Sequence, residues 1–115
     1  MSEPARDRLR SDQQATARRL AALEREHSGI VEAAGQSNAD DEHDPEGATI
    51  AFEREHLIAL IGQAREHLAE IEAASRRLDD GSYGSCSRCG QPIGAPRLAA
   101  RPTAATCIGC AVARR

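Results

Sequence analysis

Two long segments of the 115-residue chain, residues 4 to about 36 and residues 45–79, repeat their seam residues every seven positions. A heptad repeat is typical of amphipathic helices that pack along one stripe, as in a coiled coil. The sequence therefore predicts two long helices, with His27 as a polar seam residue able to fix their register. The predicted seam positions are Leu9, Gln13, Thr16, Leu20, Leu23, His27, Ile30 and Ala34 in the first segment, and Ile50, Arg54, Leu57, Ile61, Ala64, Leu68, Ile71, Ser75 and Leu78 in the second.

The residues around these segments favour a short reversal of the chain. Asp44 suits an N-cap, Pro45 suits the first position of a helix, and Gly81 suits a left-handed C-cap. Because the link is short, the two helices should run antiparallel, and each should reach about 50 Å at 1.5 Å per residue. We therefore expect an all-α fold, in which residues 1–81 form a long antiparallel two-helix coiled-coil hairpin with its tip at about 38–47.

Four cysteines follow the second segment in the pattern C-x2-C, 17 residues, C-x2-C. This spacing is typical of a site in which four thiolates surround one tetrahedral zinc ion. Two disulfides would need an oxidising compartment, yet the N-terminal MSEPARDRLR has no apolar signal-peptide core. A thioredoxin-type redox motif would need a βαβ context, which the flanks do not suggest. The sequence predicts one structural Zn²⁺ in a small module, residues 82–115, with ligands Cys86, Cys89, Cys107 and Cys110.

Composition limits the other possibilities. Phe52 and Tyr83 are the only aromatic residues, so a conventional large core is not expected. The longest apolar stretch, roughly Leu57 to Ile61, is too short to cross a membrane. With no export signal either, we expect a cytoplasmic protein. All eighteen acidic residues lie in residues 1–80, whereas residues 82–115 contain five arginines and no acid, so the two ends should meet different partners.

The predicted tip is strongly acidic. Between Arg25 and Arg54 there is no positive residue. One interpretation is a solvated loop whose carboxylates cap the second helix and favour its positive N-terminal dipole. Another is a charged probe that a stiff rod presents to a cationic groove or a metal-containing site. The five acids packed into the turn are Asp40, Asp41, Glu42, Asp44 and Glu46.

Two further interpretations of the acidic turn are disfavoured. The segment ADDEHDPEGATI lacks the D-x-[DN]-x-[DN]-G pattern and the late glutamate of a calcium-binding loop. No apolar or aromatic residues that could form a pocket accompany the acids, which argues against a catalytic carboxylate pair. Nothing in the sequence argues for an enzyme.

The cysteine module resembles a known family. The runs from Gly81 to Ile93 (GSYGSCSRCGQPI) and from Arg97 to Cys110 (RLAARPTAATCIGC) are similar to the DksA/TraR proteins, bacterial transcription factors with a four-cysteine zinc finger. The segment DDEHDPEGATIAFERE resembles the tip and second-arm start of actinobacterial members. The resemblance implies a non-enzymatic protein that binds RNA polymerase directly and inserts its coiled coil into the secondary channel, so that the tip approaches the catalytic centre. It also implies that DNA is not the target.

The resemblance is incomplete at the tip. In the best-understood members a D-x-x-D-x-A motif alters open-complex stability and works with the nucleotide (p)ppGpp. Asp44 matches the first aspartate, whereas Gly47 occupies the position of the second and Thr49 that of the alanine. Docking on the polymerase is therefore expected, with Asp44 as the leading effector residue. The direction of regulation and the participation of (p)ppGpp stay open.

Two other classes of function remain. A nucleic-acid-binding finger could use five arginines to reach phosphates, although no recognition helix follows the cysteines. Tyr83, the one aromatic residue near them, is expected to pack over the zinc knuckle with Ile93 and Leu98 rather than to stack on bases. The third class is a coiled-coil adaptor for another protein, or a dimer. The arginines in question are Arg88, Arg97, Arg101, Arg114 and Arg115.

Overall fold

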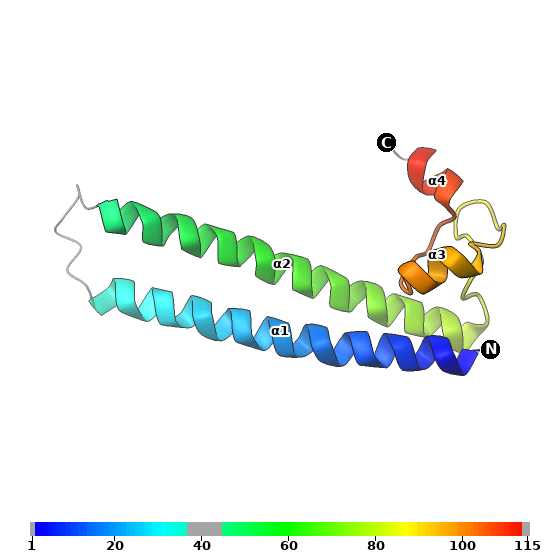
Figure 1. Cartoon of the computed structure of the whole chain (residues 1–115), viewed down its shortest axis with the longest axis horizontal. Helices are drawn as coiled ribbons and strands as arrows, with labels where there is room; N and C mark the ends of the chain where they lie inside the picture. Colours follow the sequence, from blue (N-terminus) through cyan, green and yellow to red (C-terminus); the bar gives the residue numbers. More distant parts are fainter. Residues whose placement is uncertain (1, 37–44, 114–115) are drawn as a thin grey trace. The chain divides into compact units, whose positions relative to one another are not determined.

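The computed structural model describes residues 2–36 and 45–113, together with the side chains of residues 3–33 and 47–113. Two long helices, α1 (Ser2–Gln36) and α2 (Pro45–Asp80), precede two short ones, α3 (Ala95–Ala100) and α4 (Ile108–Ala113) (Figure 1). The described residues form no β-strand, only an isolated bridge. This confirms the predicted all-α fold, in which two long helices pack as a hairpin. None of the described helices has both the length and the apolar character needed to cross a bilayer.

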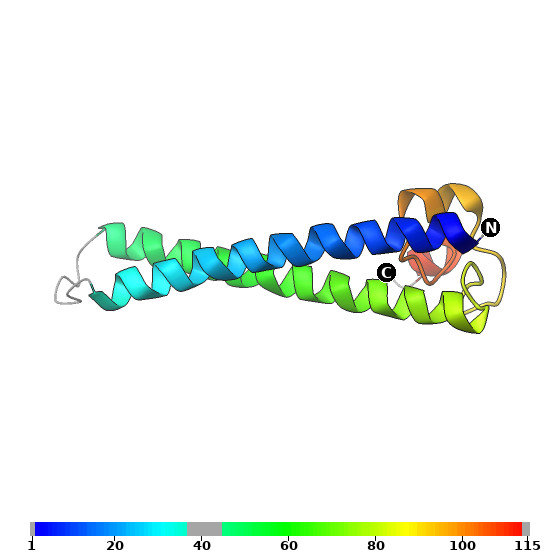
Figure 2. The same ribbon diagram turned by 90° about the horizontal axis from the view of Figure 1, so that it is seen from below.

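The chain divides into two compact units. The first combines Met1–Gln14 with Leu68–Arg115, and the second is Ala15–His67. Within each unit, a part of α1 lies beside a part of α2 with the opposite chain direction (Figure 2). The first unit thus holds one end of both long helices together with the cysteine module. The division into residues 1–81 and 82–115 that the sequence suggests stays a prediction.

The end of α2 is set by a glycine, as predicted. Gly81 has a φ of 83°, a left-handed conformation that L-residues with side chains rarely adopt. The backbone N–H of Ser82 then donates to the carbonyl oxygen of Arg77 at 2.9 Å, which is the bond that closes a Schellman motif. The chain therefore leaves α2 in a fixed direction and turns into the first cysteine pair.

The core of the first unit is small and closely packed. Leu9 of α1 and Ile71 of α2 are each only 1% exposed, and Ala74 is fully buried between the helices. Burial of an aliphatic side chain of this size stabilises a fold by about 1.5–3 kcal/mol. Tyr83, which follows α2, packs against this cluster. These contacts fix the two helix ends to each other and anchor the start of the module.

The second unit has a separate core of Leu23, Leu57 and Ile61. His27 lies next to this seam, where the sequence predicts it, and its Nε2 atom is buried without a hydrogen-bond partner among the described residues. At the surface, the Arg65 guanidinium lies 2.7 Å from the Glu24 carboxylate. The pair is largely exposed and should add little to stability.

Among the predicted seam residues whose side chains are described, two are exposed instead. Gln13 lies outside the packed stripe of α1, where Asp12 takes its place, and Arg54 is exposed near the start of α2. Leu9, Thr16 and Leu23 keep their seven-residue spacing and are buried, so on α1 the pattern fails at the position between Leu9 and Thr16. With 3.6 residues per turn, Asp12 and Gln13 lie on opposite sides of the line from Leu9 to Thr16, and Asp12 is on the side that is partly buried.

Candidate metal centre

The first cysteine pair lies in a tight turn between α2 and α3. The N–H of Cys86 donates to the Gln91 carbonyl oxygen at 2.8 Å, and the N–H of Gly90 donates back to the Cys86 carbonyl oxygen at 2.9 Å. Gly90 has a φ of 77°, so the chain reverses directly after Cys89 at a position where glycine avoids steric strain. This loop holds Cys86 and Cys89 close together at its turn.

The second cysteine pair lies at the start of α4. Cys107 directly precedes the helix, and Cys110 is its third residue. The N–H of Ala111 donates to the Cys107 carbonyl oxygen at 2.9 Å, which continues the helical pattern back to Cys107. Residues three apart on a helix lie on the same face. The spacing C-x2-C therefore brings both sulfurs of this pair toward the first pair.

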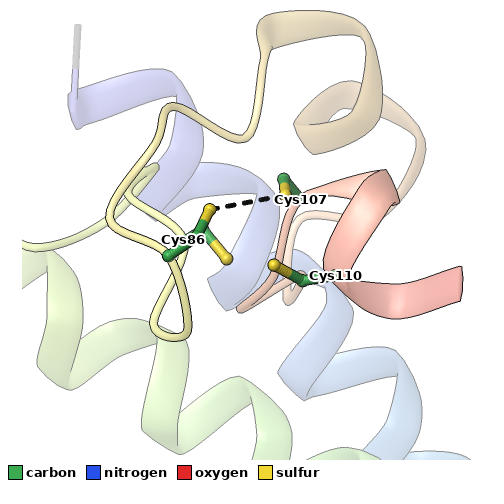
Figure 3. Close-up of side chains that lie close together, drawn as sticks. Cys86, Cys107 and Cys110 are labelled. Carbon is green, nitrogen blue, oxygen red and sulfur yellow. Dashed lines mark hydrogen bonds between the residues drawn. The ribbon is translucent and has the colours of Figure 1, made fainter. Parts of the chain in front are cut away.

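The four sulfur atoms come together in a geometry that fits a metal ion. All four Sγ atoms lie within 4.8 Å of one another, and Figure 3 shows Cys86, Cys107 and Cys110 side by side. The Sγ atoms of Cys89 and Cys107 are 3.8 Å apart. Four thiolates at about 2.3 Å from a tetrahedral zinc ion would be separated by about 3.8 Å. All four cysteines are free rather than disulfide-bonded, so the donor set fits one structural Zn²⁺.

Backbone hydrogen bonds favour the thiolate at some of these cysteines. The N–H of Cys107, followed by those of Cys89 and Arg88, lowers the pKa of the Cys86 thiol to about 6. The N–H of Cys110 lowers the pKa of the Cys107 thiol. In contrast, hydrogen bonds with the side chain of Cys107, and then with those of Cys86 and Cys89, raise the pKa of Cys110 to about 12. Four clustered sulfurs ionise together only around a cation, and the thiolate is the form that binds zinc.

Apolar side chains cover one side of the sulfur cluster. Cys86 is only 3% exposed and packs with Ile93 and Ala104, and Leu98 of α3 joins them. The predicted packing of Ile93 and Leu98 at the zinc knuckle is therefore confirmed. The prediction for Tyr83 is wrong, because its ring packs on the core of the first unit rather than over the knuckle. The Tyr83 hydroxyl donates to the Pro102 carbonyl oxygen, and this bond holds the ring at the end of α2.

The sequence did not predict a set of side chains that hydrogen-bond to the segment preceding Cys107. Residues 102–106, which we call the strap, connect α3 to Cys107. Tyr83, Arg77 and Arg97 each donate a hydrogen bond to a strap carbonyl oxygen. No local pattern marks these donors, since they come from distant positions and act on backbone atoms. Only the three-dimensional arrangement identifies them.

The arginines of the competing nucleic-acid interpretation are partly engaged. Arg97 donates to the strap, and Arg101 lies 4.0 Å from the carboxylate of Glu70 on α2. Arg88 is exposed, whereas residues 114–115 lie outside the described part of the chain. Among the described arginines, Arg97 and Arg101 therefore each have a partner within the chain, which argues against their belonging to a free basic row of the kind that tracks phosphates.

The predicted acidic turn lies mostly outside the described residues. Asp40, Asp41, Glu42 and Asp44 lie outside the described residues. Glu46 falls in the first turn of α2, and its side chain also lies outside them. The role predicted for these five acids stays a prediction.

Known proteins share both the module and the fold. The model of the prokaryotic dksA/traR C4-type zinc finger matches residues 81–114. The chain is 43% identical over 72 residues to the protein YteA of Bacillus subtilis, which covers 63% of this chain and 30% of YteA. It is 37% identical over 91 residues to the RNA polymerase-binding transcription factor DksA of Haemophilus influenzae, which covers 73% of this chain and 63% of that protein.

A solved structure extends the similarity to nearly the whole chain. The transcription factor DksA2 from Pseudomonas aeruginosa superposes with a TM-score of 0.80 at 29% identity, over 96% of this chain and 79% of that one. The chain spans less than two thirds of the two curated relatives, 30% of YteA and 63% of the Haemophilus protein. The similarity therefore covers the helical hairpin as well as the finger.

Proposed function

We propose that this chain is a transcription regulator that binds bacterial RNA polymerase, because its residues 81–114 match the prokaryotic dksA/traR C4-type zinc finger. The observation that carries the proposal is the combination of this finger with a two-helix hairpin like that of DksA2. Relatives that are similar to this chain in sequence are named RNA polymerase-binding transcription factors. The proposed role is regulatory rather than catalytic, and it is exercised in the cytoplasm.

In this proposal the hairpin enters the secondary channel of the polymerase and carries the acidic turn toward the catalytic centre. A two-helix arm suits this task because its backbone hydrogen bonds are satisfied internally, so a narrow rod stays folded with little core. The acids between Arg25 and Arg54, a stretch that contains no arginine or lysine, would suit a cationic surface on the partner. The zinc finger holds the helix ends of the first unit, so its role is structural.

The effector residues belong to the turn. Asp44 is the leading candidate, supported by Asp40, Asp41, Glu42 and Glu46. Because Gly47 stands where the family motif has its second aspartate, we propose that docking is retained while the regulatory output differs from that of members with the full motif. The participation of (p)ppGpp is tested in the same experiment, by measurements with and without the nucleotide.

The direct test is retention of the tagged, zinc-loaded chain by core RNA polymerase. Wild type is compared with a variant in which the five acids of the turn are replaced by their amides, and with a control in which the exposed α2 acids Glu66 and Glu72 are replaced by glutamine. We expect wild type and control to be retained. The turn variant should be retained too, but should lose its effect on promoter open-complex lifetime, with and without (p)ppGpp.

Two results would overturn this proposal. One is that core polymerase retains neither wild type nor the turn variant. The other is salt-sensitive binding to bare DNA, lost when Arg88 and Arg101 are replaced, because that pattern belongs to a nucleic-acid-binding finger. Unchanged regulation by the turn variant would leave docking intact and remove the role of the acids.

A further inference from the structure

Four hydrogen bonds from donors outside the strap, residues 102–106, are accepted by carbonyl oxygens of the strap. The Tyr83 hydroxyl donates to Pro102 at 2.7 Å. The backbone N–H of Ser87 donates to Ala105 at 2.8 Å. The two remaining donors are guanidinium groups: Arg77 Nη2 donates to Thr103 at 3.3 Å, and Arg97 Nε donates to Thr106 at 2.9 Å. Because each donor fixes a different carbonyl, the path of this segment is specified along most of its length.

The three side-chain donors come from three different places in the first unit. Arg77 belongs to the last turns of α2, Tyr83 follows α2 and is packed on the Leu9 and Ile71 cluster, and Arg97 belongs to α3. The strap itself is buried at its middle, where Thr103 is 7% and Ala104 5% exposed. A segment that lacks regular secondary structure is thus tied to helices on both sides.

The strap ends at Cys107, the first of the second ligand pair. The carbonyl that Arg97 engages belongs to Thr106, so this bond orients the peptide that enters Cys107. A zinc ion binds a preformed set of thiolates more tightly than a set that must first be ordered. In the second case the entropy lost in ordering the chain reduces the free energy of binding. Groups outside the ligand shell commonly contribute to metal affinity in this way.

We propose that Tyr83, Arg77 and Arg97 are positioning residues of the zinc site, which act through the strap to present Cys107 and Cys110 to the ion. Each of them donates to a carbonyl oxygen of the strap rather than to a sulfur. Their effect is on the geometry of the second ligand pair, and it links that pair to the end of α2. This proposal does not depend on polymerase binding.

The test is zinc affinity of the full chain, measured by competition with a chromophoric chelator. Tyr83→Phe removes one hydroxyl and keeps the packed ring, and Arg97→Met removes the guanidinium and keeps most of the apolar stem. We expect each to weaken zinc binding by about 10-fold, the low end of the range for groups outside the ligand shell. Arg97→Lys, which retains a donor, should recover part of the loss. Arg76→Met is the matched control for Arg77→Met, since Arg76 is exposed and pairs only with Glu72 on the described surface of α2.

A spectroscopic readout separates positioning from general destabilisation. With Co²⁺ in place of zinc, every variant should keep the visible bands of a tetrahedral four-thiolate site, while metal release to the chelator becomes faster. Helicity by circular dichroism should stay at the wild-type level in the metal-loaded state. Zinc affinity within twofold of wild type for both Tyr83→Phe and Arg97→Met would overturn the proposal. So would an equal loss of affinity in Arg76→Met and Arg77→Met.

Discussion

The Tyr83 hydroxyl donates a 2.7 Å hydrogen bond to the Pro102 carbonyl oxygen, across 19 positions of the chain. The ring of the same side chain packs against the Leu9, Ile71 and Ala74 cluster. One residue therefore contacts both the apolar core of the first unit and the segment that leads to the second cysteine pair. Order at the metal site and order at the end of α2 should depend on each other.

Removal of zinc should unfold the finger before it changes the structure of the rest of the chain. Residues 84–110 bury little apolar surface of their own, with Cys86, Ile93 and Ala104 as their buried cluster. Without a cation the four sulfurs repel one another as they ionise, so the module should lose its fixed structure on chelation. We expect one zinc ion per chain when the metal content is measured by inductively coupled plasma mass spectrometry. On treatment with a chelator under reducing conditions, hydrogen exchange should rise in residues 84–110 while residues 15–33 stay protected.

The comparison that decides this prediction is the metal-free protein. Unchanged exchange in residues 84–110 after complete zinc removal would mean that the apolar cluster alone maintains the module. Cys110→Ser gives an independent check, because it removes one ligand with little change in volume. It should bind zinc more weakly and show the same exchange pattern at low zinc concentration.

The sequence predicted those features that local chemistry determines. Pro45 begins α2, and Gly81 ends it with the positive φ that glycine favours. The C-x2-C spacing predicted the sulfur cluster, because each pair depends only on a turn of a few residues. Helix type and helix ends could be read because the periodic pattern and its boundaries lie in adjacent residues.

Long-range packing could not be read in the same way. The heptad pattern placed Gln13 in the seam, although Asp12 occupies that side of α1. The choice between neighbouring positions depends on how the helix is rotated about its axis, which the partner helix sets. Likewise, the sequence does not determine which of two apolar surfaces Tyr83 packs against, and no local pattern indicates that Arg97 donates to Thr106.

Ile71→Ala should destabilise the protein by about 2–4 kcal/mol, since it leaves a cavity in a core position that is only 1% exposed. Ile58→Ala removes the same atoms from a side chain that is 45% exposed. It should cost less than about 1 kcal/mol, as is usual at surface positions. Urea denaturation followed by helical circular dichroism gives both values. Equal effects of the two substitutions would show that the Leu9 and Ile71 cluster does not stabilise the hairpin.

Adding one methyl group at two glycines should change stability in opposite directions. Gly29 lies within α1, and a Cβ there would meet no atom within 4 Å. Gly29→Ala should therefore stabilise the protein by about 0.5–1 kcal/mol through the higher helix propensity of alanine. Gly81 has equal space around it but a φ of 83°. Gly81→Ala should destabilise it by about 1–2 kcal/mol, the cost of a left-handed residue with a side chain.

Thermal denaturation of the zinc-loaded protein distinguishes these two effects. The expected result is a higher midpoint for Gly29→Ala and a lower one for Gly81→Ala. A lower midpoint for Gly29→Ala would indicate that the α1 backbone near Ser28 needs the freedom of glycine, contrary to its regular helical geometry.

Asp80, the last residue of α2, should titrate below its ordinary pKa of 3.8. A carboxylate at a helix C-terminus is disfavoured by the helix dipole, which would raise the pKa. The Ser82 hydroxyl and then the Ser82 N–H outweigh this effect and lower the pKa, because both donate to the charged form, at 2.5 Å and 2.9 Å. Since the folded pKa lies below the unfolded one, the stabilising contribution is complete above the unfolded value. It is lost as the pH falls through the folded value.

Ser82→Ala should move the pKa of Asp80 part of the way back toward 3.8, as measured by carbon NMR of the carboxyl group. Ser75→Ala, whose hydroxyl donates to Ile71 instead, should leave the Asp80 pKa where it is. An Asp80 pKa that does not change in Ser82→Ala would assign the shift to the backbone N–H alone.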